Sequence, residues 1–204
     1  MTPYSPRVAG IFDDINKKVE NCYDVAKKAK TMGFDPDSYV KIPLAKNMAE
    51  RVEGLISTVA PEILGKGVPE RIQQLEEEYG SQDWRIALVI AEEVAKQKFC
   101  EFESKKKAIE IGIRVGFAYV TVGVVSSPLE GFIGIDIRKR DDGKEYFALI
   151  YGGPIRSAGG TGASVSVLIS DYVRKKLGYS TYDAKEREIK RAYTELCDYH
   201  ERVT

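Results

Sequence analysis

The chain has 204 residues, of which 43% are hydrophobic and 30% are charged, as in an ordinary globular protein. Its 31 Lys and Arg residues balance its 31 Asp and Glu residues, so the net charge does not indicate a nucleic-acid binder. Three scattered cysteines and one histidine, His200, argue against a zinc site and against a histidine-dependent catalytic triad. The sequence shows no signal peptide, and we therefore expect a cytoplasmic protein with reduced thiols and no membrane segment.

The first predicted element is a helix over residues 6–32. Apolar residues recur along it at helical spacing, and Gly33 is a natural stop. We interpret its lysine-rich face as solvated, with contact to a partner or to DNA backbone as the alternative. The lysines of that face are Lys17, Lys18, Lys27, Lys28 and Lys30.

Three more helices are predicted in the first half of the chain. Asn47 with Glu50 is typical of a capping box at a helix start, and Pro69 suits the first turn of the next helix. A further helix is expected over about residues 83–99. Trp84, at its start, is interpreted as a core anchor.

An almost wholly apolar run over residues 108–125 opens the second half. Its length approaches that of a membrane span, but Glu110 and Arg114 fall inside it. We therefore predict a buried central helix. Gly112 and Gly116 are expected to permit close packing against a neighbour.

A β-hairpin is predicted next. Ile133, Ile135 and Ile137 alternate with other residues as in a strand, residues 141–143 form a turn, and residues 146–151 return. The tip is basic, which usually means exposure to solvent, although such tips also contact nucleic-acid backbone. Its candidate phosphate contacts are Arg138, Lys139 and Arg140.

Two helices are expected to follow. The first ends at Gly178 and should bury Val165, Leu168, Ile169 and Tyr172. The second should begin with a capping box of Asp183 and Glu186, and should carry Ile189, Tyr193, Leu196 and Tyr199 on one face. The predicted fold class is α+β: a helical part over residues 1–103, then a buried helix, a β-hairpin and a glycine-loop/helix unit over residues 104–204. The two parts are compatible with one continuous domain that is cut at its C-terminus.

The most distinctive stretch is the glycine-rich loop over residues 152–162, between the second strand and the following helix. Glycines let backbone N–H groups face one point, and the positive end of a helix dipole favours an anion there. The candidate phosphate-binding residues are Arg156, Ser157, Gly159, Gly160 and Thr161. The loop matches neither the Walker A motif nor the dinucleotide fingerprint. Pattern alone leaves two interpretations: anion or backbone contact, and a tight structural connection.

Five stretches stand out, here in chain order: TVGVVSSPLEGF, EYFALIY, YGGPIRSAGGT, SVLISDYVRKKLG and CDYHERVT. In sequence and in order they resemble the N-terminal region of the large subunit of the archaeal family-D replicative DNA polymerase. The family often has Ala-Gly-Pro at Gly152-Gly153-Pro154 and Thr-Ala-Gln at Thr161-Gly162-Ala163. These departures put in doubt only a role that needs a side chain at position 162.

The resemblance implies an architectural or interaction domain of a DNA-directed DNA polymerase. The implied partners are a small subunit with 3′–5′ exonuclease activity, primer–template DNA and, through the full-length subunit, a sliding clamp. Mg²⁺ and zinc are implied for the full-length subunit only, and no catalytic or metal-binding residue is carried over to this chain. The alternatives are a free-standing protein that binds a nucleotide phosphate with the 152–162 loop, and a purely structural subunit-assembly domain.

Overall fold

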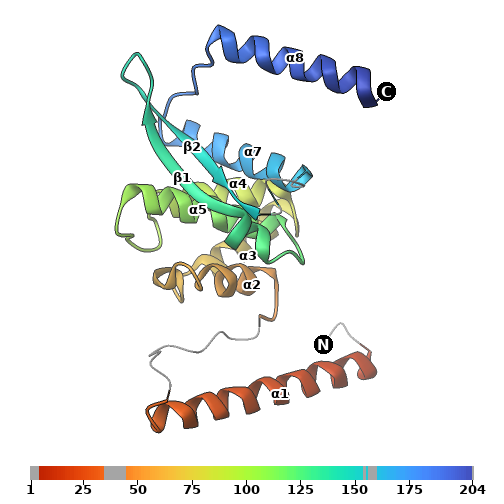
Figure 1. Ribbon diagram of the computed structural model, residues 1–204. Helices are drawn as coiled ribbons and strands as arrows, with labels where there is room; N and C mark the ends of the chain where they lie inside the picture. The colour runs from red at the N-terminus through yellow and green to blue at the C-terminus, as the bar shows by residue number, and fades with distance from the viewer. Residues whose placement is uncertain (1–4, 35–44, 154, 156–159, 204) are drawn as a thin grey trace.

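The structure is a computed structural model that describes residues 5–34, 45–153, 155 and 160–203. A helical body, a two-stranded antiparallel hairpin and two outlying helices make up these residues (Figure 1). The body contains α2 (Met48–Ile56), α3 (Val68–Tyr79), α4 (Trp84–Ala95), α5 (Lys105–Val120) and α7 (Gly160–Lys176). The hairpin consists of β1 (Phe132–Lys139) and β2 (Glu145–Tyr151), and the outlying helices are α1 (Pro6–Thr31) and α8 (Glu186–Val203). The predicted α+β class is confirmed.

The centre of the body is the contact between α4 and α5. A Cβ atom on Gly112 would lie 2.5 Å from the carbonyl oxygen of Ala91, and one on Gly116 would lie 2.5 Å from that of Ala87. The two helices therefore approach so closely that no side chain fits at either glycine. The predicted buried helix and its close packing are confirmed. Buried side chains from both sides of the predicted boundary at residue 103 join one hydrophobic cluster, while the division itself stays a prediction.

Local signals account for several helix boundaries. The Asn47 side chain accepts a hydrogen bond from the Glu50 N–H at 2.9 Å, while Glu50 accepts one from the Lys46 N–H at 2.8 Å. This is the expected cap at the start of α2. A proline lies in the first turn of α3, as predicted, and Gly80 ends that helix with a φ of 98°.

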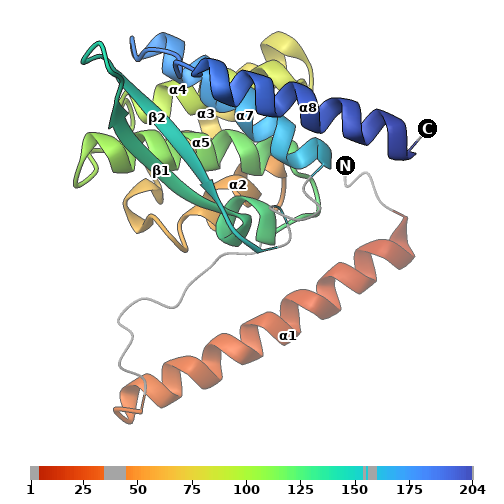
Figure 2. The same cartoon turned by 45° about the horizontal axis from the view of Figure 1, so that its top comes forward.

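The hairpin lies across α5 on one side of the body (Figure 2). Ile135 pairs with Leu149, and Ile137 with Phe147, but the register shifts between Phe132 and Gly134. This bulge turns Ile133 outward, where it is 52% exposed, while Phe132 is fully buried. The predicted hairpin is confirmed, but the predicted regular alternation of isoleucines is wrong at Ile133.

Two helices end earlier than predicted. The apolar run continues to residue 125, but α5 stops at Val120. Arg51 donates hydrogen bonds to the carbonyls of Ala118, Thr121 and Val124, which satisfies acceptors at and after this helix end. The side chains of Val122, Val124 and Val125 are exposed. Helix α4 ends at Ala95 rather than near Phe99, because Gln97 adopts a left-handed φ of 57° and closes the C-terminal turn.

Two burial predictions and one predicted helix start are wrong. Trp84 is 56% exposed at the first position of α4, so it is not a core anchor. Leu168 is 50% exposed, because α7 turns Ile169, Val173 and two serines inward instead. The start of α8 also differs, since the Lys185 N–H donates to Glu188 and Asp183 pairs with Arg140.

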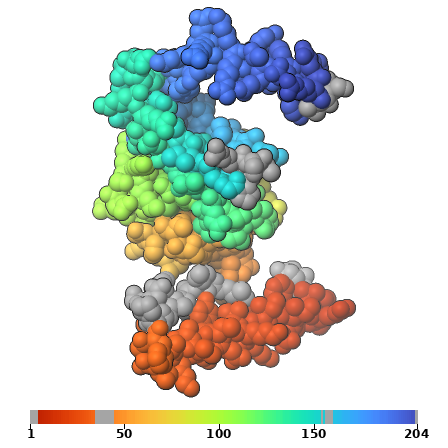
Figure 3. All heavy atoms as spheres, viewed as in Figure 1, coloured from red at the N-terminus to blue at the C-terminus, as the bar shows by residue number. Residues whose placement is uncertain are grey.

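The helices α1 and α8 form separate layers at the two ends of the molecule (Figure 3). The predicted first helix is confirmed by α1, yet none of its residues is buried, and Ile11, Phe12 and Ile15 are 40–52% exposed. The apolar face predicted for the last helix is present on α8. It is exposed along its whole length.

Candidate functional site

The glycine-rich loop connects β2 to α7, as predicted. Of its candidate residues, Arg156, Ser157 and Gly159 lie outside the residues that the structure describes. Gly160 and Thr161 are exposed in the first turn of α7, and Gly160 has a left-handed φ of 44°. This places two of the candidate backbone N–H groups at an accessible helix N-terminus, where an anion is favoured.

The start of the loop packs tightly against the turn before β1 and the first residues of that strand. The Gly152 N–H donates to the Gly131 carbonyl at 3.0 Å. A Cβ atom on Gly152 would lie 2.7 Å from Ile133 Cδ1, and one on Gly131 would lie 3.0 Å from Ile155 Cγ2. Glycine at these two positions therefore serves close packing, which supports the structural interpretation for this part of the loop.

Arg114 holds the turn before β1 in place, a role that the sequence did not reveal. Its guanidinium is buried and donates hydrogen bonds to the carbonyls of Pro128 and Leu129, at 2.6 and 2.8 Å, and of Ile133, at 2.6 Å. Its Nε also donates to Glu110 at 3.0 Å. The single arginine of an apolar helix thus holds both the turn before β1, which contains the short π-helix η2 (Ser127–Gly131), and the bulge. The sequence signal for this role was the pair of charged residues, Glu110 and Arg114, inside an otherwise apolar run.

The basic side chains of the hairpin tip differ in their partners. Arg138 Nε lies 3.1 Å from Asp136 Oδ2, and its hydrogen bond holds the pKa of Asp136 below the ordinary value. Arg140 lies 3.2 Å from Asp142 and 3.4 Å from Asp183, and donates to the Thr181 carbonyl at 3.0 Å. Lys139 is exposed but, unlike the two arginines, it forms no ion pair with another described residue.

The connector over residues 179–185 runs from α7 along the hairpin tip to α8. The Tyr179 ring meets Phe147 with centroids 5.6 Å apart, and the Tyr182 ring meets Tyr146 at 5.3 Å. The Ser180 N–H donates to the Glu145 carbonyl at 2.8 Å, which ties the connector to the start of β2. No motif in the sequence indicated a role for these tyrosines.

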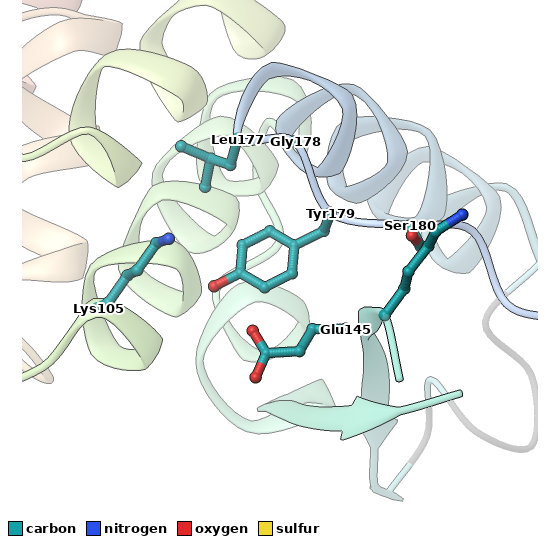
Figure 4. Close-up of a pocket in the computed structure, with 7 residues that line it drawn as sticks. Lys105, Glu145, Leu177, Gly178, Tyr179 and Ser180 are labelled. Carbon is teal, nitrogen blue, oxygen red and sulfur yellow. The ribbon is translucent and has the colours of Figure 1, made fainter. Parts of the chain in front are cut away.

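Two shallow pockets flank this connector. The first has a volume of about 310 Å³, and in it Lys105 and Glu145 extend toward Tyr179 (Figure 4). The Lys105 ammonium lies 4.9 Å from the centre of the Tyr179 ring, as in a cation–π contact. The second pocket, of about 360 Å³, lies between the hairpin tip and Tyr182. Acidic and basic side chains line both, so neither has the uniform sign that a polyanion requires.

The described residues contain no candidate metal-binding site. No group of three or more His, Cys, Asp or Glu side chains there is arranged to hold an ion. The Mg²⁺ and zinc that the resemblance implies concern the full-length subunit and stay predictions. In the same part of the chain, no helix is long and apolar enough to cross a bilayer.

A family model described as "DNA polymerase II large subunit DP2, N-terminal" matches residues 10–204. The chain is 45% identical over 192 residues to the DNA polymerase II large subunit of Nanoarchaeum equitans, which covers 94% of this chain and 15% of the relative. It is 40% identical over 203 residues to that of Thermococcus kodakarensis, covering 98% of this chain and 11% of the relative.

A third relative of the same name, from Methanococcoides burtonii, is 43% identical over 188 residues, covering 92% of this chain and 16% of the relative. The chain belongs to the DNA polymerase II large-subunit family. The predicted family is thereby confirmed. Because the chain spans only 11–16% of these relatives, what a whole DNA polymerase II large subunit does is a matter for proposal.

Proposed function

We propose that these residues form an N-terminal domain of a replicative DNA-directed DNA polymerase large subunit, and that the domain serves subunit assembly and DNA-backbone contact. The observation that carries the proposal is the family match over residues 10–204. We assign no catalytic role to any residue of this chain. When bound to the large subunit elsewhere, two Mg²⁺ ions would stabilise the attacking and leaving oxygens of nucleotidyl transfer.

Partners follow from the same proposal. The large subunit would assemble with a small subunit that has 3′–5′ exonuclease activity, and the pair would bind primer–template DNA in the cytoplasm. Contact with a sliding clamp would be made through the full-length subunit. The relatives' shared name, DNA polymerase II large subunit, supports the existence of a partner subunit.

The DNA contact is assigned to the glycine loop and to Lys139. The exposed N-terminus of α7 offers the N–H groups of Gly160 and Thr161, and Arg156 would add a guanidinium from the same loop. Arg138 and Arg140 are weaker candidates than the sequence suggested, because carboxylates of the hairpin and connector already neutralise them. A cation that is already paired gains less from a phosphate.

The test is the salt dependence of DNA affinity, measured with the heterodimer of the full-length large subunit and the small subunit. Arg156→Ala and Lys139→Ala should each reduce the slope of log K against log salt by about 1, because each removes one phosphate contact. Lys66→Ala is the matched control, since Lys66 is an exposed lysine on the loop before α3 and is not one of the candidate phosphate contacts. A wild-type slope in both test variants would contradict the DNA contact.

A purely structural assembly domain is the second candidate, and the packing of Gly131 and Gly152 favours it. It predicts that Arg156→Ala leaves DNA affinity unchanged at every salt concentration. The third interpretation, a free-standing binder of nucleotide phosphate, predicts stoichiometric dNTP binding in calorimetry that Arg156→Ala abolishes. That result would contradict the polymerase-domain proposal.

A further inference from the structure

The helix α8 carries an uncovered stripe of large apolar side chains. Ile189 is 57% exposed, Tyr193 and Leu196 are each 70% exposed, and Tyr199 is 66% exposed. Their spacing of three and four residues places them on one face of the helix. We propose that this α8 stripe docks into an apolar groove formed by the part of the large subunit that lies outside these residues. The inference rests on the proposed function.

The body of this chain does not cover the stripe. The connector fixes the start of α8 at the hairpin tip through Arg140, which contacts Asp183 and the Thr181 carbonyl, and through Lys185, 3.3 Å from Asp141. From there α8 runs above α7 and roughly parallel to it (Figure 1), and it packs extensively against no other described element. These contacts hold the start of α8 and leave its apolar face exposed.

The charges of α8 exclude DNA and a membrane surface as the favoured occupant. Residues 186–203 contain five acidic and four basic residues, whereas a helix for either surface would be rich in Lys and Arg. Two of the cations are already paired within the helix: Lys190 lies 2.7 Å from Glu186, and Arg191 lies 2.7 Å from Glu195. The polar face thus has no excess of positive charge for a polyanion or an anionic bilayer, and the apolar stripe is left to drive association with protein.

The small size of the stripe favours an occupant on the same polypeptide. A stable interface between separate proteins uses about 20–30 residues on each side, far more than one face of a single helix offers. A covalently linked groove meets the stripe at an effective concentration of about the millimolar range, so a few apolar contacts suffice. The relatives, of which this chain covers 11–16%, contain ample chain to form such a groove.

Hydrogen–deuterium exchange on the full-length large subunit alone, without DNA or small subunit, tests the proposal. The α8 amides should be protected in the wild type. In Tyr193→Ala/Leu196→Ala they should exchange about 100-fold faster, because the buried apolar contacts are lost. Alanine is a better helix former than either residue, so faster exchange will not reflect a weaker helix.

The matched control is Thr194→Ala/Glu201→Ala, which makes two alanine substitutions on the opposite face of α8 and should exchange like the wild type. Peptides from α5 serve as an internal reference for an intact body in both variants. Unchanged α8 exchange in Tyr193→Ala/Leu196→Ala would overturn the proposal.

Two other results would also overturn it. Protection that arises only when the small subunit is added would assign the stripe to that partner. Protection that depends on protein concentration would assign it to a second copy. Because the experiment contains no DNA, its failure is distinguishable from failure of the proposed function, which is measured by the salt dependence of DNA affinity.

Discussion

Helices α5 and α8 each have apolar residues at helical spacing, but their surroundings differ. In α5 the side chains from Ala108 to Tyr119 are nearly all buried, and Gly112 fits against Ala91 of α4. In α8 the apolar stripe is 57–70% exposed. The spacing of apolar residues therefore predicts a helix and its interacting face. Whether that face is covered depends on a complementary surface elsewhere in the chain.

The largest expected effect is on Arg114, which links α5 to the turn before β1. Arg114→Met should lower the free energy of unfolding by about 3–5 kcal/mol, since it leaves Glu110 and three carbonyls without their buried donor. Urea denaturation measures the change. Arg191→Met, which breaks an exposed pair on α8, should change the free energy by less than about 0.5 kcal/mol. Equal effects of the two substitutions would contradict the comparison.

Gly112→Ala should have the next largest effect. The added Cβ atom would lie 2.5 Å from the Ala91 carbonyl oxygen, so α4 and α5 must separate, and we expect a loss of about 3 kcal/mol. The same substitution at Gly10 of α1 meets nothing within 4 Å. Gly10→Ala should leave the thermal midpoint of the body unchanged and slightly raise the helix content seen by circular dichroism. A lower midpoint for Gly10→Ala would show that α1 packs on the body.

The smallest expected effect is a pH dependence that arises from Glu93 in α4. Burial alone would raise the pKa of Glu93, but hydrogen bonds from Arg71 and Lys98 outweigh it and leave the pKa below the ordinary value of 4.5. Glu93 therefore stabilises the fold above that value, and the contribution is lost as the pH falls through it and below.

In urea titrations at pH values from about 6 down to about 3, Glu93→Gln should remove about 1 kcal/mol of this pH-dependent loss of stability. Glu195→Gln on α8 is the control, since its ion pair with Arg191 is exposed. An unaltered pH dependence in Glu93→Gln would show that other carboxylates produce the acid sensitivity.

Local sequence signals predicted the elements well. The Asn47 cap, the proline start of α3 and the turn at residues 141–143 depend on neighbours a few residues apart, and each is present. The end of α5 was mispredicted, and the carbonyls there are bonded by Arg51, a partner about 70 residues away in sequence that local patterns do not reveal. The outward turn of Ile133 depends on a bulge that the alternating pattern concealed.

The candidate site was predicted less completely for the same reason. The sequence identified a basic hairpin tip, but the Asp183 carboxylate that pairs with Arg140 comes from the connector, more than 40 residues later. The role of Arg114 depends on the fold of the turn that it holds. Of the glycine-loop candidates, the structure describes Gly160 and Thr161, and a role in phosphate binding stays a prediction for all of them.

Amide hydrogen exchange of this 204-residue chain, resolved by residue, tests the central comparison most directly. We predict that the amides of α4 and α5 exchange only through global unfolding. Those of α8 should exchange at least about 100-fold faster, because its apolar stripe is exposed and no described element packs extensively against that helix. Protection of α8 equal to that of α5 would contradict the account, because the α8 stripe would then already be covered within this chain.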